Sequence, residues 1–70
     1  MVDLTPRQSQ VYELMVEGKT YNQIAGELAL SIRTVEFYAS RIAAKIPGTG
    51  APLRKILKYA LENTAQNGHI

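Results

Sequence analysis

The stretch from Leu30 to Ile46 constrains the fold of this chain most, because its side chains divide between two unlike faces of one helix. Its apolar residues recur at the spacing of a single helical stripe, which must pack against a core: Val35, Ala39, Ile42 and Ile46. At about 100° per residue, the opposite face carries Arg33, Phe37, Ser40 and Ala44, with Glu36 and Arg41 at its flanks. An exposed phenylalanine among arginines predicts that this outer face binds a partner.

The length and charge of the chain limit what that partner can be. The 70 residues suffice for one domain with a small core. Residues 1–30 carry four acidic and two basic side chains, whereas residues 31–70 carry two acidic and six basic ones. A basic half is typical of proteins that bind a polyanion, although a solvated charged surface explains it equally well. The absence of cysteine, of a secretion signal and of a long apolar run predicts a cytoplasmic protein without membrane segments.

Two capping boxes predict where the first helices begin. In each, a threonine is followed three residues later by a glutamine, at Thr5 and Gln8 and again at Thr20 and Gln23. We expect helices over residues 6–17 and 21–28. A short turn then leads to Ser31, which caps the helix expected over residues 32–46. Two helices joined by so short a turn are typical of a helix-turn-helix.

The rest of the chain predicts one more helix. Residues 47–52 contain two prolines and two glycines and are therefore expected to form a loop. A helix over residues 52–63 follows, with an apolar stripe of Leu53, Ile56, Leu57, Ala60 and Leu61. Residues 65–70 lack helical periodicity, so we expect a domain over residues 1–64 and a flexible tail over 65–70. The predicted fold is all-α with four helices.

Nothing in the sequence predicts catalysis, a metal site or a cofactor. The single histidine, His69, lies in the expected tail. Glu13 and Glu17 form a carboxylate pair at helical spacing, and a solvated polar face explains them better than acid–base chemistry. The segment Gly48-Thr49-Gly50 lacks the preceding strand and following lysine of a phosphate-binding loop. We therefore expect a binding protein and not an enzyme.

The aromatic residues leave alternatives open. Phe37 is exposed by chance, contacts a protein, or contacts a thymine methyl group, and the last interpretation is favoured. Tyr21, in the first turn of its helix, either reaches a phosphate with its hydroxyl or covers the rim of the core. Tyr38 is expected to be half-buried with its hydroxyl in solvent. Tyr12 and Tyr59 are expected at the edges of the core.

A spaced set of residues carries a family resemblance across about residues 3–63. It comprises Leu4-Thr5-Pro6-Arg7-Gln8, Gly18, Ile24-Ala25, Leu28, Leu30-Ser31, Thr34-Val35-Glu36, Tyr38, Arg41-Ile42 and Lys45-Ile46. This set resembles the LuxR/GerE-type helix-turn-helix domain. The resemblance implies a four-helix DNA-binding domain that regulates transcription, dimerises through its last helix and places its third helix in the major groove.

The resemblance also implies roles for individual residues. By position, Glu36, Phe37 and Ser40 match base-facing residues of the family. Residues that match contacts or close approaches to the DNA backbone are Thr20, Tyr21, Asn22, Thr34, Tyr38 and Lys45. Arg33 and Arg41, on the outer face of the same helix, complete the predicted DNA-binding set as contacts to bases or nearby phosphates.

The predicted function is therefore a sequence-specific regulator of transcription that binds double-stranded DNA as a homodimer, with helix 32–46 in the major groove. The dimer interface is expected on the last helix, at Leu53, Ile56, Leu57, Tyr59 and Ala60. Members of the family usually carry a sensor or receiver domain as well. We expect a stand-alone domain here, controlled by its abundance or by a partner.

A protein-interaction module is the alternative. In it, helix 52–63 pairs with another LuxR-type transcription factor and inhibits or modulates it. Two departures from the family motivate this interpretation: Glu36 stands where a lysine or arginine is common, and the loop 47–52 is longer than usual and lacks an arginine. RNA polymerase is a further candidate partner, and a fragment of a larger regulator is a third interpretation.

Overall fold

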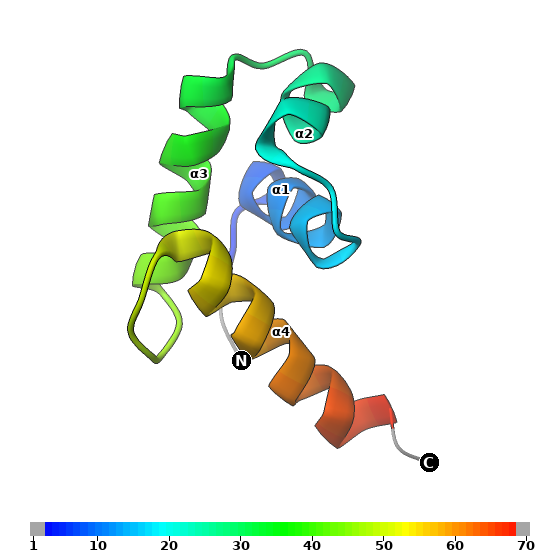
Figure 1. Cartoon of the computed structure of the whole chain (residues 1–70), viewed down its shortest axis with the longest axis vertical. Coiled ribbons are helices and arrows are strands. Elements are labelled where there is room, and N and C mark those ends of the chain that lie inside the picture. Colours follow the sequence, from blue (N-terminus) through cyan, green and yellow to red (C-terminus); the bar gives the residue numbers. More distant parts are fainter. Residues whose placement is uncertain (1–2, 69–70) are drawn as a thin grey trace.

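The computed structural model describes the backbone of residues 3–68 and the side chains of residues 3–63. Within that part of the chain it consists of four helices and no strand, which confirms the predicted all-α class (Figure 1). The helices are α1 (Pro6–Val16), α2 (Tyr21–Leu28), α3 (Ile32–Ala44) and α4 (Pro52–Gly68). Among the described helices, none combines the length and the apolar character that a membrane span requires.

Both predicted capping boxes are formed. The Gln8 N–H donates to the Thr5 hydroxyl and the Thr5 N–H donates to Gln8 Oε1, each over 3.2 Å. At α2 the Gln23 N–H donates to the Thr20 hydroxyl over 3.1 Å, and Thr20 N–H donates to Gln23 Oε1 over 2.8 Å. Each cap satisfies N–H groups that the helix leaves without a partner, which is worth about 1 kcal/mol.

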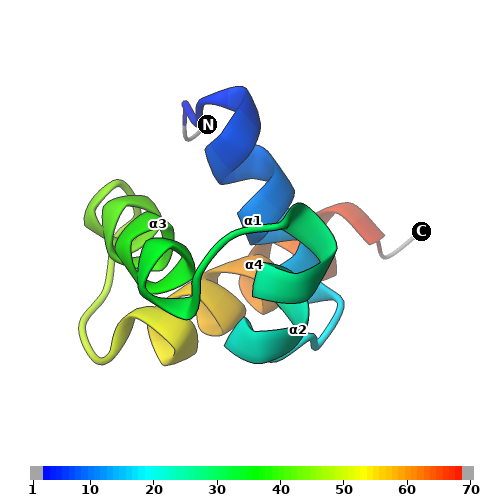
Figure 2. The same ribbon diagram turned by 90° about the horizontal axis from the view of Figure 1, so that it is seen from above.

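A tight turn sets the angle between α2 and α3. Ala29 ends α2 in the left-handed conformation, with φ of 57°, and the Leu30 N–H donates to the Ala25 carbonyl over 2.9 Å. Ser31 then caps α3 by accepting from the Thr34 N–H over 3.1 Å. Figure 2 shows the short connection between the two helices, which confirms the predicted helix-turn-helix geometry.

α3 packs against each of the other three helices through one face. Its predicted stripe is buried at all four positions, Val35, Ala39, Ile42 and Ile46. These side chains meet residues of the other helices in one core, which includes Val11, Met15, Ile24 and Ile56. The face of α3 opposite this stripe is left exposed, at the edge of the molecule in Figure 1.

Three helix ends differ from the prediction. α1 ends at Val16, one residue before the expected end at residue 17. α3 ends at Ala44 rather than at residue 46, because the Lys45 and Ile46 N–H groups bond to the carbonyls three residues back, over 2.9 and 3.4 Å, and tighten the last turn. α4 continues to Gly68, beyond the expected end at residue 63, and no proline or glycine interrupts residues 53–67. It thus overlaps the expected tail, and His69 lies outside the described residues.

Candidate nucleic-acid interface

The outer face of α3 carries the predicted base-facing residues together. Its exposed side chains are Arg33, Glu36, Phe37, Ser40 and Arg41. Phe37 is 56% exposed although it is a large apolar residue. Within residues 3–63, no carboxylate lies within ion-pair distance of either arginine, since the ion pair formed there joins Lys19 and Glu27 over 2.7 Å. Neither arginine therefore forms an ion pair within these residues, although Glu36 lies on the same face.

Phe37 and Arg41 contact each other on this face. The Arg41 guanidinium carbon lies over the Phe37 ring, 5.2 Å from its centroid. The Phe37 and Tyr38 rings also meet in an edge-to-face arrangement, with 6.0 Å between centroids and 67° between planes. Tyr38 is half-buried and packs against the core, as the sequence predicts. The exposed aromatic ring is thus held between a core-anchored tyrosine and an arginine.

The start of α2 presents a second group of predicted residues. Thr20 and Asn22 are exposed, and the first N–H groups of the helix point out of its end. Tyr21 is half-buried and packs against the core. Burial raises the pKa of the Tyr21 hydroxyl above its ordinary value of 10.0, and the negative charge of Glu36 raises it further. The hydroxyl is therefore neutral at physiological pH and can donate a hydrogen bond.

Lys45 has contacts that sequence reasoning missed. Its ammonium donates to Gln8 Oε1 over 2.8 Å and to the Asp3 carbonyl over 2.9 Å. Gln8 is buried, and its Oε1 also accepts from the Thr5 N–H. The capping box signalled that this glutamine turns back toward the helix start, but not that its oxygen has a second partner. Lys45 thus fastens the end of α3 to the start of α1 and keeps one N–H for another acceptor.

Thr34 is also engaged within the protein. Its hydroxyl shares a 2.9 Å hydrogen bond with the Ser31 hydroxyl, at the cap of α3. Any contact of Thr34 with a DNA backbone therefore has to use the remaining hydrogen-bonding capacity of this hydroxyl, which can both donate and accept.

The predicted dimer residues of α4 separate into three groups. Leu53 and Leu57 are partly exposed, at 40% and 39%, and Leu61 on the same flank is 71% exposed. Ile56 is fully buried and Ala60 nearly so, and both pack into the core of the protomer. Tyr59 is half-buried on the other flank, where it packs against that core.

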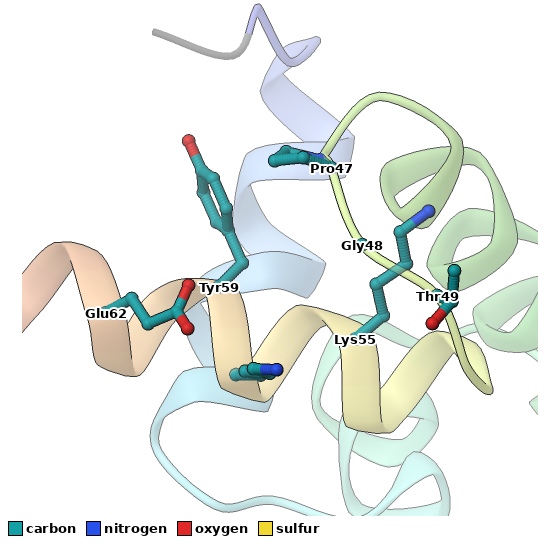
Figure 3. Close-up of a pocket in the computed structure, with 7 residues that line it drawn as sticks. Pro47, Gly48, Thr49, Lys55, Tyr59 and Glu62 are labelled. Carbon is teal, nitrogen blue, oxygen red and sulfur yellow. The ribbon is translucent and has the colours of Figure 1, made fainter.

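Each flank of α4 borders a depression. Val16 from α1 joins Leu57, Ala60 and Leu61 around an open apolar groove. On the other flank, Lys55 and Tyr59 extend toward the loop at Pro47–Thr49, and Lys58 and Glu62 complete that depression (Figure 3). The apolar flank suits association with another protein surface, whereas the loop flank is polar and charged.

Known proteins similar to this chain are regulators. The family described as "Bacterial regulatory proteins, luxR family" matches residues 2–50. A "Probable transcriptional regulator ycf29" of Cyanophora paradoxa is 44% identical over 62 residues, which are 89% of this chain and 29% of that protein. The "Response regulator Rre1" of Synechocystis is 36% identical over 63 residues, 89% of this chain and 26% of that protein.

A shorter relative covers less of the chain. The "Spore germination protein GerE" of Bacillus subtilis is 42% identical over 43 residues, which are 61% of this chain and 58% of that protein. The chain thus spans less than a third of the ycf29 and Rre1 relatives. No solved structure matches it significantly. The family match contains α1, α2 and α3 and ends before α4.

Proposed function

We propose that this chain, which belongs to the luxR family of bacterial regulatory proteins, binds double-stranded DNA sequence-specifically as a homodimer and so regulates transcription in the cytoplasm. The observation that carries the proposal is the outer face of α3. That face exposes two arginines without carboxylate partners in residues 3–63, while the opposite face is fixed in the core. A rigid helix with such a face has the form of a recognition helix.

In the proposed complex, α3 lies in the major groove, whose width of about 12 Å admits one helix. Arg33, Ser40 and Arg41 supply hydrogen-bond donors toward base edges and nearby phosphates. Glu36 supplies a carboxylate, which accepts from the amino group of cytosine. A helix face with both charges and an aromatic ring is better suited to distinguishing bases than to general attraction for phosphate.

The phosphate contacts of the proposed complex come from neighbouring elements. The start of α2 offers outward N–H groups, the Thr20 hydroxyl, the Asn22 amide and the neutral Tyr21 hydroxyl, and a helix start favours anions. Lys45 has one N–H left after its two contacts with Gln8 and Asp3. Such contacts fix the register of a protein on the duplex without reading sequence.

The homodimer is proposed to form through the leucine flank of α4, defined by Leu53, Leu57 and Leu61. These leucines and Val16 are the exposed large apolar residues of the α1–α4 side, and partly exposed leucines lose water-contacting area when two copies meet. Two-fold pairing would place two α3 helices on one side of the duplex. It implies an inverted-repeat site with half-sites separated by about one helical turn.

A gel-shift titration at several salt concentrations tests DNA binding. We expect specific retardation of a duplex, with an affinity that falls linearly on logarithmic axes as salt rises, because bound cations release counterions from phosphate. Failure to bind any duplex, or binding without a salt slope, would reject the function.

Leu57→Glu tests the dimer surface. We expect this variant to sediment as a monomer and to bind a two-half-site duplex about tenfold or more weakly, because a charge replaces an apolar contact. Lys58→Gln is the matched control, since it changes the net charge by the same amount on the other side of α4. Dimers of Leu57→Glu, or monomers of both variants, would contradict the proposed interface, and circular dichroism checks the fold of each.

The same leucine flank supports a second candidate function, which is pairing with a longer LuxR-type regulator. Glu36 on the outer face of α3 is consistent with weaker phosphate binding by this chain alone. Titration into a full-length regulator of this type would then give a one-to-one heterodimer and release that regulator from its DNA. An unchanged regulator–DNA complex would exclude this function.

A further inference from the structure

Phe37 and Arg41 contact each other and form one physical unit on the outer face of α3. They lie one helical turn apart, and the Arg41 guanidinium carbon is 5.2 Å from the centre of the Phe37 ring. Both are exposed. The Phe37 ring is in turn held by the edge contact with Tyr38, which packs against the core. These contacts connect the core, through Tyr38 and then Phe37, to the Arg41 guanidinium.

The direction of the arginine follows from helix geometry. Long side chains on a helix lean toward its N-terminus, so Arg41 lies over the turn that contains Phe37, whereas Arg33 leans away from that ring. This contact between Arg41 and Phe37, called the stack below, therefore places the Arg41 guanidinium nearer to the N-terminal half of α3 than the third turn from which the side chain starts. In helix-turn-helix proteins that half of the recognition helix contacts base edges.

The stack also leaves the N–H donors of Arg41 available for hydrogen bonds to a base. A cation over an aromatic ring interacts with the ring charge distribution and forms no hydrogen bond. Within residues 3–63, Arg41 has no ion pair and donates no hydrogen bond to a side chain, so its N–H groups remain available. Guanine is the base whose major-groove edge offers two adjacent acceptors, O6 and N7, which a guanidinium binds in a bidentate way.

We propose that Arg41 reads a guanine in the target site and that Phe37 is a positioning residue that holds the Arg41 guanidinium for this contact. Holding a flexible arginine before binding reduces the entropy lost when it binds. This assignment differs from the sequence-based interpretation of Phe37 as a direct contact to a thymine methyl group. It rests on the proposed function, since it requires α3 to enter the major groove.

The stack itself is testable without DNA. In the free protein, ring currents of Phe37 shift the nuclear magnetic resonance signals of the Arg41 side chain. Phe37→Leu, which keeps an apolar side chain and removes the ring, should return these signals to ordinary arginine values. Arg41 signals that are ordinary in the wild type already would overturn the pairing.

The test with DNA uses a duplex selected by the wild-type protein. Each guanine of a half-site is replaced in turn by 7-deazaguanine, which lacks the N7 acceptor, and each thymine by uracil, which lacks the methyl group. We expect one guanine whose replacement weakens wild-type binding about 2- to 10-fold, because the arginine keeps O6 and loses only one of the two acceptors of a bidentate contact. Arg41→Ala should be insensitive to that replacement.

Phe37→Leu decides the role of the ring. We expect it to lose most of the preference for the same guanine and to add nothing when combined with Arg41→Ala. Additive losses, an unchanged guanine preference, or a loss confined to one thymine-to-uracil position would overturn the positioning role. Absence of any duplex bound by the wild type would overturn the proposed function itself. Thermal unfolding shows that each variant is folded, which is expected because both side chains are exposed.

Discussion

The outer faces of α3 and α4 differ although both helices are amphipathic in sequence. On α3 the apolar stripe is fully used by the core, and the outer face carries charges and one ring covered by an arginine. On α4 the stripe is wider than the core, so Ile56 and Ala60 are buried while the leucine flank remains in contact with water. This difference supports the proposal that α3 binds a polar, charged partner and α4 an apolar one.

Adjacent residues of α4 allow the sharpest test of this comparison. Ile56 is fully buried, whereas its neighbour Leu57 is 39% exposed. Ile56→Ala should lower the free energy of unfolding by about 2–5 kcal/mol, because it leaves a cavity. Leu57→Ala should cost about 1 kcal/mol in the monomer, since less area is buried. Urea unfolding at low protein concentration measures both, and equal losses would show that the two sides of α4 are not distinct.

Ser40→Glu tests the outer face of α3, where we expect a loss of DNA binding rather than a loss of stability. We expect duplex binding to weaken roughly 100-fold or more, because a carboxylate in the groove faces phosphates and base acceptors. The unfolding midpoint should stay nearly constant, since Ser40 is exposed. A large drop in stability would mean that this face packs against the protein. Ser40→Ala serves as the variant without added charge.

The turn that precedes α3 contains a strained residue. Before α3 the turn is tight and Ala29 has a φ of 57°, a conformation in which alanine is strained by about 1 kcal/mol. Ala29→Gly should therefore raise the free energy of unfolding by up to that amount. Destabilisation by Ala29→Gly would show that the turn is not strained.

Gly26→Ala should also stabilise the protein by about 1 kcal/mol, because Gly26 is inside α2 and a Cβ there meets no atom within 4 Å.

The smallest expected effect concerns Tyr21, which links the start of α2 to α3. Burial first and the Glu36 charge second raise the Tyr21 pKa above 10.0. The folded state therefore holds this proton more tightly than the unfolded state, so stability is lost as pH rises through the raised pKa. Glu36→Gln should lower the Tyr21 pKa but leave it above 10.0. Magnetic resonance titration of the tyrosine rings measures this.

Tyr12 provides the internal control for that titration. Its pKa is raised by burial and by Tyr59, and Glu36 is not among the causes. It should be unaffected by Glu36→Gln. A Tyr21 pKa that is unchanged by Glu36→Gln would mean that the start of α2 and the outer face of α3 do not interact electrostatically.

The sequence was sufficient for the local features of the fold. Capping boxes at Thr5 and Thr20 and the stripe of α3 depend on residues three or four apart, so their geometry follows from the helix itself. The exposure of Phe37 was predicted by the same reasoning. The preference of Phe37 for Arg41 over Arg33 was also within reach, because helical side chains lean toward the N-terminus.

Tertiary features were not within reach of the sequence. Lys45 meets Gln8 and Asp3 across 37 and 42 positions of the chain, and no local pattern encodes that contact. The five apolar residues of α4 form one stripe in the sequence. Only the packing of α4 against α1 and α3 decides that Ile56 is buried and Leu61 is exposed. The DNA-binding and dimer roles remain predictions that the experiments above address.

Selection of bound sequences from a random duplex pool tests the central claim most directly, because it examines both helices at once. If α3 reads bases and the leucine flank of α4 pairs two copies, the selected duplexes will share an inverted repeat whose half-sites lie about one helical turn apart. A pool that stays random after repeated selection, or one enriched in single half-sites only, would contradict the account.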